Sequence, residues 1–180
     1  MVYCYLTWWY SWTGTTEDLS KDFIEKKRGV TPNDVILPPE VAILFLKRQA
    51  TASPHVLVRR VAFEKVGGFD ENFPCVYEDQ VFCTKIALKY PIYVSSESWY
   101  LWRQHPNAFH VLESQRYHEL WYSYLMWFKQ YVKDNQIKNP KLLFTMWNTI
   151  IQLRHAWFLG PIKRNLGFVK KFITAGRLPK

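Results

Sequence analysis

The sequence predicts a mixed α/β body over residues 1–110, followed by an α-helical C-terminal extension over residues 111–180. Three observations lead to this prediction. The first residues are aromatic and rich in strand-forming types, the middle of the chain alternates short strand-like and capped helix-like runs, and apolar residues beyond position 116 recur with the helical period. Hydrophobic residues make up 48% of the 180 residues and charged residues 22%, a balance typical of a folded domain.

Local signals place the individual elements. Thr15 or Thr16 before two acidic residues marks a helix start, because a hydroxyl caps the free N–H groups of a first turn. The glycine pair 67–68 predicts a turn with positive φ, with Phe69 as its anchor, and Pro91 ends a helix. In chain order, we expect a strand over 2–12, helices over 16–27 and 38–49, a short apolar segment over 55–59, helices over 61–66 and 78–89, strands over 92–94 and 99–103, and helices over 117–132, 140–158 and 162–173.

The positive charge is confined to the C-terminal part of the chain. The net charge is +9, and residues 136–180 hold nine Lys and Arg but no Asp or Glu. No nucleic-acid-binding motif accompanies this charge, so we expect no nucleic-acid partner. The apolar run 142–153 is too short to cross a bilayer, and the three widely spaced cysteines fit neither a disulfide framework nor a zinc site. We therefore expect a cytoplasmic protein, with at most a peripheral position on the inner face of the membrane.

Four motifs between residues 56 and 107 carry the chemistry. They are VLVRR at 56–60, VGGFDE at 66–71, YEDQ at 77–80 and WRQHPN at 102–107. Their order and spacing resemble the second half of family-2 glycosyltransferases with a GT-A-type fold. The resemblance covers residues 1–110 well and the later helices more loosely. It implies a partial GT-A-like mixed sheet with flanking helices, and transfer of a sugar from a nucleotide-sugar to a hydroxyl of a glycan or lipid-linked acceptor.

Such a transfer needs a base. The acceptor hydroxyl is a weak nucleophile at neutral pH, so a neighbouring group must take its proton as the new bond forms. By resemblance Asp79 is this base, and Glu78 orients it or contacts the acceptor. The alternative from the residues alone is that both acids only stabilise the N-terminus of a helix.

The resemblance also implies a cationic and aromatic surround. The departing diphosphate develops negative charge, and Arg103 and Arg60 are its expected contacts, with His105 as a metal ligand. Trp102 and Tyr77 are candidates for stacking on a sugar. The competing interpretations are core packing for Trp102 and ordinary surface positions for the Arg and His residues.

The donor-binding part of such an enzyme is missing from the sequence. In the family, an N-terminal βαβ half ends in an Asp-x-Asp motif that holds Mn²⁺ or Mg²⁺, and this chain contains no D-x-D tripeptide. A divalent cation is therefore expected from the family without its usual ligands. The resemblance implies an acceptor-side half that depends on a missing half or a partner chain for the nucleotide-sugar, and that has low activity alone.

Two functions without catalysis remain open. The same cleft would serve in a carbohydrate-binding or partner-docking module. Alternatively, the basic, aromatic residues 161–180 suit an anionic membrane surface. For residues 140–160 we favour a simpler interpretation, a helical cap packed on the sheet with solvated lysines.

Overall fold

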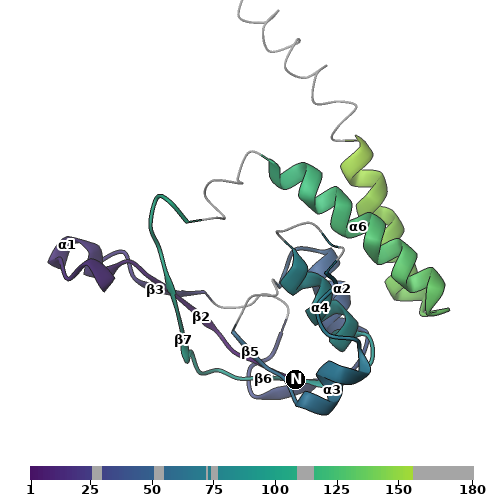
Figure 1. Ribbon diagram of the computed structural model, residues 1–180, viewed down its shortest axis with the longest axis horizontal. Helices are drawn as coiled ribbons and strands as arrows, with labels where there is room; N and C mark the ends of the chain where they lie inside the picture. Colours follow the sequence, from purple (N-terminus) through teal and green to yellow (C-terminus); the bar gives the residue numbers. More distant parts are fainter. Residues whose placement is uncertain (26–29, 51–54, 72, 74–76, 109–115, 156–180) are drawn as a thin grey trace, which may run out of the picture.

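A computed structural model describes residues 1–25, 30–50, 55–71, 73, 77–108 and 116–155. These residues form a mixed α/β structure that contains two mixed sheets (Figure 1). In chain order the elements are β1 (Val2–Tyr3), β2 (Leu6–Trp9), the 3-10 helix η1 (Ser11–Thr13), α1 (Thr16–Leu19), β3 (Phe23–Glu25), β4 (Asp34–Ile36), α2 (Glu40–Leu46), β5 (Val56–Leu57), α3 (Arg60–Lys65), α4 (Glu78–Ala87), β6 (Ile92–Val94), β7 (Tyr100–Arg103), α6 (Tyr117–Asp134) and a helix over 140–155.

One ribbon of two parallel strands runs through both sheets. β1 pairs in parallel with β6, and their continuations β2 and β7 pair in parallel again. Between the two pairings, the N–H of Ser95 donates to the carbonyl of Tyr3 at 2.8 Å, and the N–H of Tyr5 donates to the carbonyl of Glu97 at 3.0 Å. The two sheets are therefore successive sections of the same ribbon.

Antiparallel strands complete each sheet. β4 joins β6 and β5 joins β1, which gives a four-stranded sheet of order β4-β6-β1-β5. β3 joins β2 in the three-stranded sheet of order β3-β2-β7. This second sheet projects from the body and carries η1 and α1 at its end (Figure 1). We call β2, η1, α1, β3 and β7 together the arm.

One apolar core joins the four-stranded sheet to the helices. Buried side chains from β1, α2, α4, β6, α6 and the helix 140–155 pack in a single cluster. Tyr124 of α6 is fully buried, and its hydroxyl lies 2.8 Å from the hydroxyl of Thr84 on α4. On the helix 140–155, Lys141 forms a 2.6 Å ion pair with Glu40 of α2. The described helix 140–155 thus packs in the same core as α2, α4 and α6, and its Lys141 is ion-paired with α2, where the sequence favoured solvated lysines. Residues 156–160 of the predicted cap lie outside the described residues.

The predicted helix over 16–27 is wrong over residues 20–25, and residues 26 and 27 lie outside the described part of the chain. Helix α1 has a single turn, and residues 23–25 form β3, which pairs with β2. Asp22 turns the chain: its carboxylate accepts hydrogen bonds from the N–H of Tyr10 at 2.6 Å and from the N–H and hydroxyl of Ser11 at 3.0 and 2.6 Å. Pairing with a distant strand thus overrides a helix signal that local sequence supports.

Other elements follow the sequence closely. The strand over 92–94 has its predicted bounds, and the helices predicted over 78–89 and 117–132 appear as α4 and α6. The strand predicted over 2–12 is divided into β1, β2 and η1, and β4 was not predicted at all. The helix predicted over 162–173 lies outside the described residues. Within the described residues, no helix combines the length and apolar character that crossing a bilayer requires.

The glycine pair forms the predicted turn after α3. Gly67 and Gly68 have φ values of 74° and 59°. The N–H of Gly67 donates to the carbonyl of Glu64 and the N–H of Gly68 to the carbonyl of Phe63, both at 3.0 Å. These two bonds make a Schellman motif, which satisfies carbonyls that the end of a helix leaves open. The turn directs the chain from α3 toward the start of α4.

The two glycines differ in what surrounds them. A side chain at either position adopts a left-handed conformation, which costs roughly 1–2 kcal/mol. A Cβ at Gly68 would also lie 2.9 Å from Cζ of Phe63, whereas nothing lies within 4 Å of a Cβ at Gly67. We expect Gly68→Ala to lower the free energy of unfolding more than Gly67→Ala does, measured by urea denaturation. Equal losses would show that the Phe63 ring moves aside without cost.

Candidate functional site

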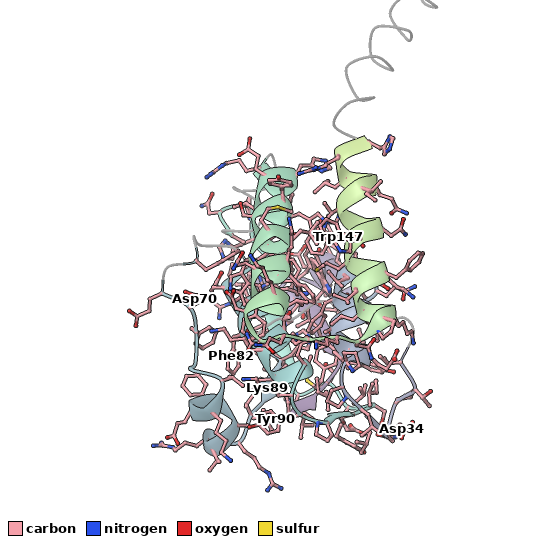
Figure 2. The ribbon with its side chains drawn as sticks, turned by 90° about the vertical axis from the view of Figure 1, so that its right-hand side faces the viewer. Asp34, Asp70, Phe82, Lys89, Tyr90 and Trp147 are labelled. Carbon is pink, nitrogen blue, oxygen red and sulfur yellow. The ribbon has the colours of Figure 1, made fainter. Side chains whose placement is uncertain are left out.

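Helix α4 places Glu78 and Asp79 at one edge of the four-stranded sheet. Both acids lie in its first turn. The helix descends from Phe82 to Lys89 and Tyr90 in Figure 2, and the chain then reverses into β6. The N-terminus of α4 therefore lies toward the carboxyl ends of β6 and of its parallel neighbour β1. In open α/β sheets, ligands bind outside the carboxyl ends of the strands.

Tyr77 fixes the start of this helix. Its φ is 76°, a left-handed conformation that is uncommon for residues other than glycine. The ring packs against both Trp121 and Tyr124 of α6, with centroid distances of 5.7 and 5.8 Å. These contacts hold the turn in place. Tyr77, a predicted sugar-stacking residue, is thus packed against α6 and does not belong to the lining of the pocket described next.

A pocket of about 810 Å³ lies between α3, α4 and the edge strand β5. It brings together three predicted site residues, Asp79, Glu78 and Arg60. We call it the acidic pocket, because three carboxylates and one guanidinium line it. Its lining consists of Val56, Val58, Arg60, Phe63, Glu64, Phe69, Glu78, Asp79, Phe82 and Cys83.

Three aromatic rings form one wall of the acidic pocket. Phe69, which follows the glycine turn, lies 4.7 Å from Phe82 of α4, and Phe63 of α3 lies 5.3 Å from Phe82 between ring centroids. Phe69 is the anchor that the sequence predicts. The cluster ties α3 to the middle of α4, and Figure 2 shows Phe82 on the side of α4 that faces α3. Aromatic rings next to polar groups are suited to the apolar faces and hydroxyl edges of sugars.

The carboxyl of Asp79 titrates near neutral pH. Burial, and after it the negative charge of Glu78, raise the pKa of Asp79 to about 7. A hydrogen bond of 2.6 Å, which the N–H of Gln80 donates to Oδ1 of Asp79, acts in the opposite direction. A group with this pKa is present in both protonation states at neutral pH, which is the condition for an effective general base.

Cys83 lies one turn beyond Asp79 in the same wall and is not a nucleophile. Burial raises the pKa of this thiol well above its ordinary range. The thiol is therefore protonated at neutral pH, and only a thiolate attacks efficiently. Within the lining of the acidic pocket, Asp79 is the group whose pKa is raised to about 7.

Trp102 and Arg103 lie on the arm and not in the acidic pocket. Trp102 packs on Trp8 of the neighbouring strand, with ring centroids 4.5 Å apart, and it is half-buried on the arm and not part of the apolar core. The guanidinium carbon of Arg103 lies 5.7 Å from the ring centroid of Trp9 and 5.1 Å from that of Trp12. These are cation–π distances, so the aromatic rings of the arm hold the Arg103 charge.

His105 is exposed and lines a second pocket of about 350 Å³ at the end of the arm. The acidic residue of that lining is Asp18, whose Oδ1 accepts a hydrogen bond from Lys21 at 2.7 Å. This bond and those from Thr13 and Thr15 lower the pKa of Asp18 to about 2. The two pockets share no lining residue. The structure therefore separates His105 and Arg103 from the predicted base.

The described residues do not supply a metal centre. Among them, no group of three or more His, Cys, Asp or Glu side chains could hold a metal ion. The pocket that His105 lines also contains the carboxylate of Asp18, which is a possible second metal ligand. Asp18, however, already accepts a hydrogen bond from Lys21. The Mn²⁺ or Mg²⁺ expected from the family does not fit the donors of this part of the chain.

Arg48 is a candidate site residue that the sequence analysis missed. Its guanidinium carbon lies 5.4 Å from the ring centroid of Trp121, and its backbone has a positive φ of 56°. Burial raises the pKa of the Tyr77 hydroxyl. The positive charge of Arg48 lowers this pKa, and the negative charge of Asp79 raises it. The Arg48 guanidinium and the Asp79 carboxyl thus both lie close enough to the start of α4 to act on Tyr77. In the sequence, Arg48 resembles any basic residue after a helix end, so no local signal marks it.

No protein-family model, no curated protein and no solved structure matches this chain.

A measurement of the pKa of Asp79 tests whether burial and Glu78 act on this carboxyl as described. We expect the side-chain carboxyl of Asp79 to titrate near pH 7 in ¹³C-detected NMR, because burial and Glu78 both disfavour its charge. Glu78→Gln removes the neighbouring charge and is expected to lower the pKa of Asp79. Glu64→Gln is the matched control, since Glu64 lines the same pocket but does not contribute to this shift. A Glu64→Gln effect as large as that of Glu78→Gln would contradict this account.

Stability should fall as pH rises, because the pKa of Asp79 is higher in the folded chain than in the unfolded one. The folded state binds the proton more tightly, so the stabilisation is present below about pH 4 and is lost between about pH 4 and pH 7. Asp79→Asn removes this loss and is expected to raise the free energy of unfolding at pH 8 by roughly 1–3 kcal/mol. Urea denaturation at several pH values measures the effect. Parallel pH profiles for the two proteins would contradict the raised pKa.

Proposed function

We propose that this chain is the acceptor-binding part of a glycosyltransferase, which transfers a sugar from a nucleotide-sugar to a hydroxyl of a glycan or lipid-linked acceptor. The observation that carries the proposal is the Asp79 carboxyl, whose pKa is raised to about 7, at the wall of a pocket with aromatic rings and further carboxylates. The order of the four sequence motifs supports the same function.

Asp79 would act as the general base of the transfer. Its carboxylate accepts the proton of the acceptor hydroxyl while that oxygen forms a bond to the anomeric carbon of the donor sugar. The bond between the anomeric carbon and the phosphate oxygen breaks, and the nucleoside diphosphate leaves with its electron pair. A single in-line displacement of this kind inverts the anomeric centre. The protonated Asp79 then releases its proton to water.

The charge of the acidic pocket supports the proposal that it would hold the acceptor and not the donor. Glu64, Glu78 and Asp79 repel a diphosphate, and Arg60 is the single cation of the lining. Sugar hydroxyls, in contrast, donate hydrogen bonds to carboxylates. The diphosphate would be held outside the pocket, by a nucleotide-binding half on a partner chain, and Arg48, whose charge acts on Tyr77, is a cation near the start of α4.

The arrangement of the strands is compatible with a partial GT-A-like fold. A parallel strand pair forms the middle of the larger sheet, and the acids begin a helix beside the carboxyl ends of this pair. Arg103 and His105 lie outside the acidic pocket, so no contact in this structure supports their expected roles as diphosphate contact and metal ligand.

A carbohydrate-binding module without catalysis is the second candidate. The aromatic wall and the carboxylates bind a sugar whether or not transfer follows, and the described residues lack a set of metal donors. The two candidates differ in one property. Binding by the module needs no proton transfer, so it tolerates the loss of a base.

The role of Asp79 can be tested with full-length chain, a panel of saccharides, and UDP- and GDP-sugars with Mn²⁺. We expect saccharide binding in saturation-transfer NMR and slow transfer that increases as pH rises through 7, as Asp79 loses its proton. Asp79→Asn should retain binding but lower transfer by roughly 100-fold or more. Glu17→Gln is the matched control, because Glu17 is an exposed acid in the first turn of α1.

Three outcomes separate the candidates. Binding with transfer that depends on Asp79 supports the transferase. Saccharide binding without transfer, unchanged in Asp79→Asn, supports the binding module. If the wild-type chain binds no saccharide, both candidates are wrong.

A further inference from the structure

The helix 140–155 exposes an apolar stripe on the side away from the core. Phe144, Trp147 and Ile151 recur at the spacing that places residues on one helix face. Their exposed fractions are 74%, 46% and 51%, which are large values for such side chains. The buried face of the same helix consists of Leu142, Met146 and Ile150.

One cation contacts this stripe, and others are exposed on the same and neighbouring segments. Nζ of Lys129 on α6 lies 4.9 Å from the ring centroid of Trp147, and Figure 2 shows Trp147 between the two helices. Lys133, Lys138 and Arg154 are also exposed, on the last turn of α6, in the connection and near the end of the described helix. Glu40 of α2 forms an ion pair with Lys141 of the helix 140–155, and this pair neutralises the negative charge of Glu40.

We propose that this face of the helix 140–155 rests on the surface of a membrane that contains anionic lipids. Phe, Trp and Ile insert into the boundary between head groups and acyl chains, and flanking Lys and Arg side chains attract anionic head groups. The stripe and its cations have this composition. Residues 136–180 hold no Asp or Glu that would be repelled by such a surface.

Charge disfavours a second copy of the chain as the occupant. In a two-fold dimer, the same patch faces itself. Lys129, Lys138 and Arg154 of one copy would then approach the same cations of the other copy. An anionic lipid surface removes this repulsion and accepts the same apolar side chains. The proposal concerns a surface separate from the acidic pocket, and it holds whether or not the chain transfers sugars.

Vesicle co-sedimentation of the full chain tests the lipid contact. We expect binding to vesicles of phosphatidylcholine with phosphatidylglycerol, weaker binding to phosphatidylcholine alone, and a loss of binding as salt increases. Phe144→Gln/Ile151→Gln should bind the anionic vesicles roughly tenfold more weakly, because it removes apolar insertion. Both positions are exposed, and glutamine is a good helix former, so circular dichroism should show an unchanged fold.

Leu101→Gln is the matched control. Leu101 is 54% exposed on β7 of the arm, far from the helix 140–155 (Figure 1). We expect it to bind vesicles like the wild type. Lys129→Gln removes the charge that lies over the Trp147 ring and leaves the sequence of the helix 140–155 unchanged, and it should weaken binding to anionic vesicles only.

Three results would overturn the proposal. The first is unchanged binding of Phe144→Gln/Ile151→Gln, and the second is an absence of wild-type binding at low salt. The third is a wild-type dimer in sedimentation velocity that the double variant converts to a monomer, which would assign the stripe to self-association.

Discussion

The position of α4 between two aromatic clusters determines the properties of the acidic pocket. Before its first turn, Tyr77 packs against Trp121 and Tyr124 of α6. In its middle, Phe82 is held by Phe63 and Phe69 at the turn after α3. These contacts hold the first turn where Asp79 is largely removed from water. Burial is the main cause of its raised pKa, so the packing of aromatic rings controls the proton affinity of the proposed base.

The structure divides the predicted site residues into two groups. Asp79, Glu78 and Arg60 meet in the acidic pocket. Arg103 instead lies on the arm beside Trp9 and Trp12, and His105 lines a separate pocket at the end of the arm. The parallel ribbon explains the division. Because β6 continues into β7 and β1 into β2, residues 100–105 follow the ribbon out of the body and away from α4. Only the first group supports a base at an acceptor site.

Features encoded within a few neighbouring residues could be predicted from the sequence. The glycine pair sets the turn after α3, since both positions adopt positive φ, and Phe69 anchors it. The helical period predicts α6 and its buried face. The prediction for 16–27 was wrong because Asp22 bonds with Tyr10 and Ser11, and β3 bonds with β2. Arg48 was missed because its neighbours Tyr77 and Trp121 are distant in sequence.

By itself, the sequence determined the alternation of strands and helices, the acids at the start of α4 and the concentration of cations after residue 135. These depend on residue type and on separations of a few positions. Only the tertiary structure decided which acids share a pocket, which of them is desolvated and which side of the helix 140–155 faces water. Desolvation and exposure arise from contacts between segments far apart in the chain, and no local pattern specifies them.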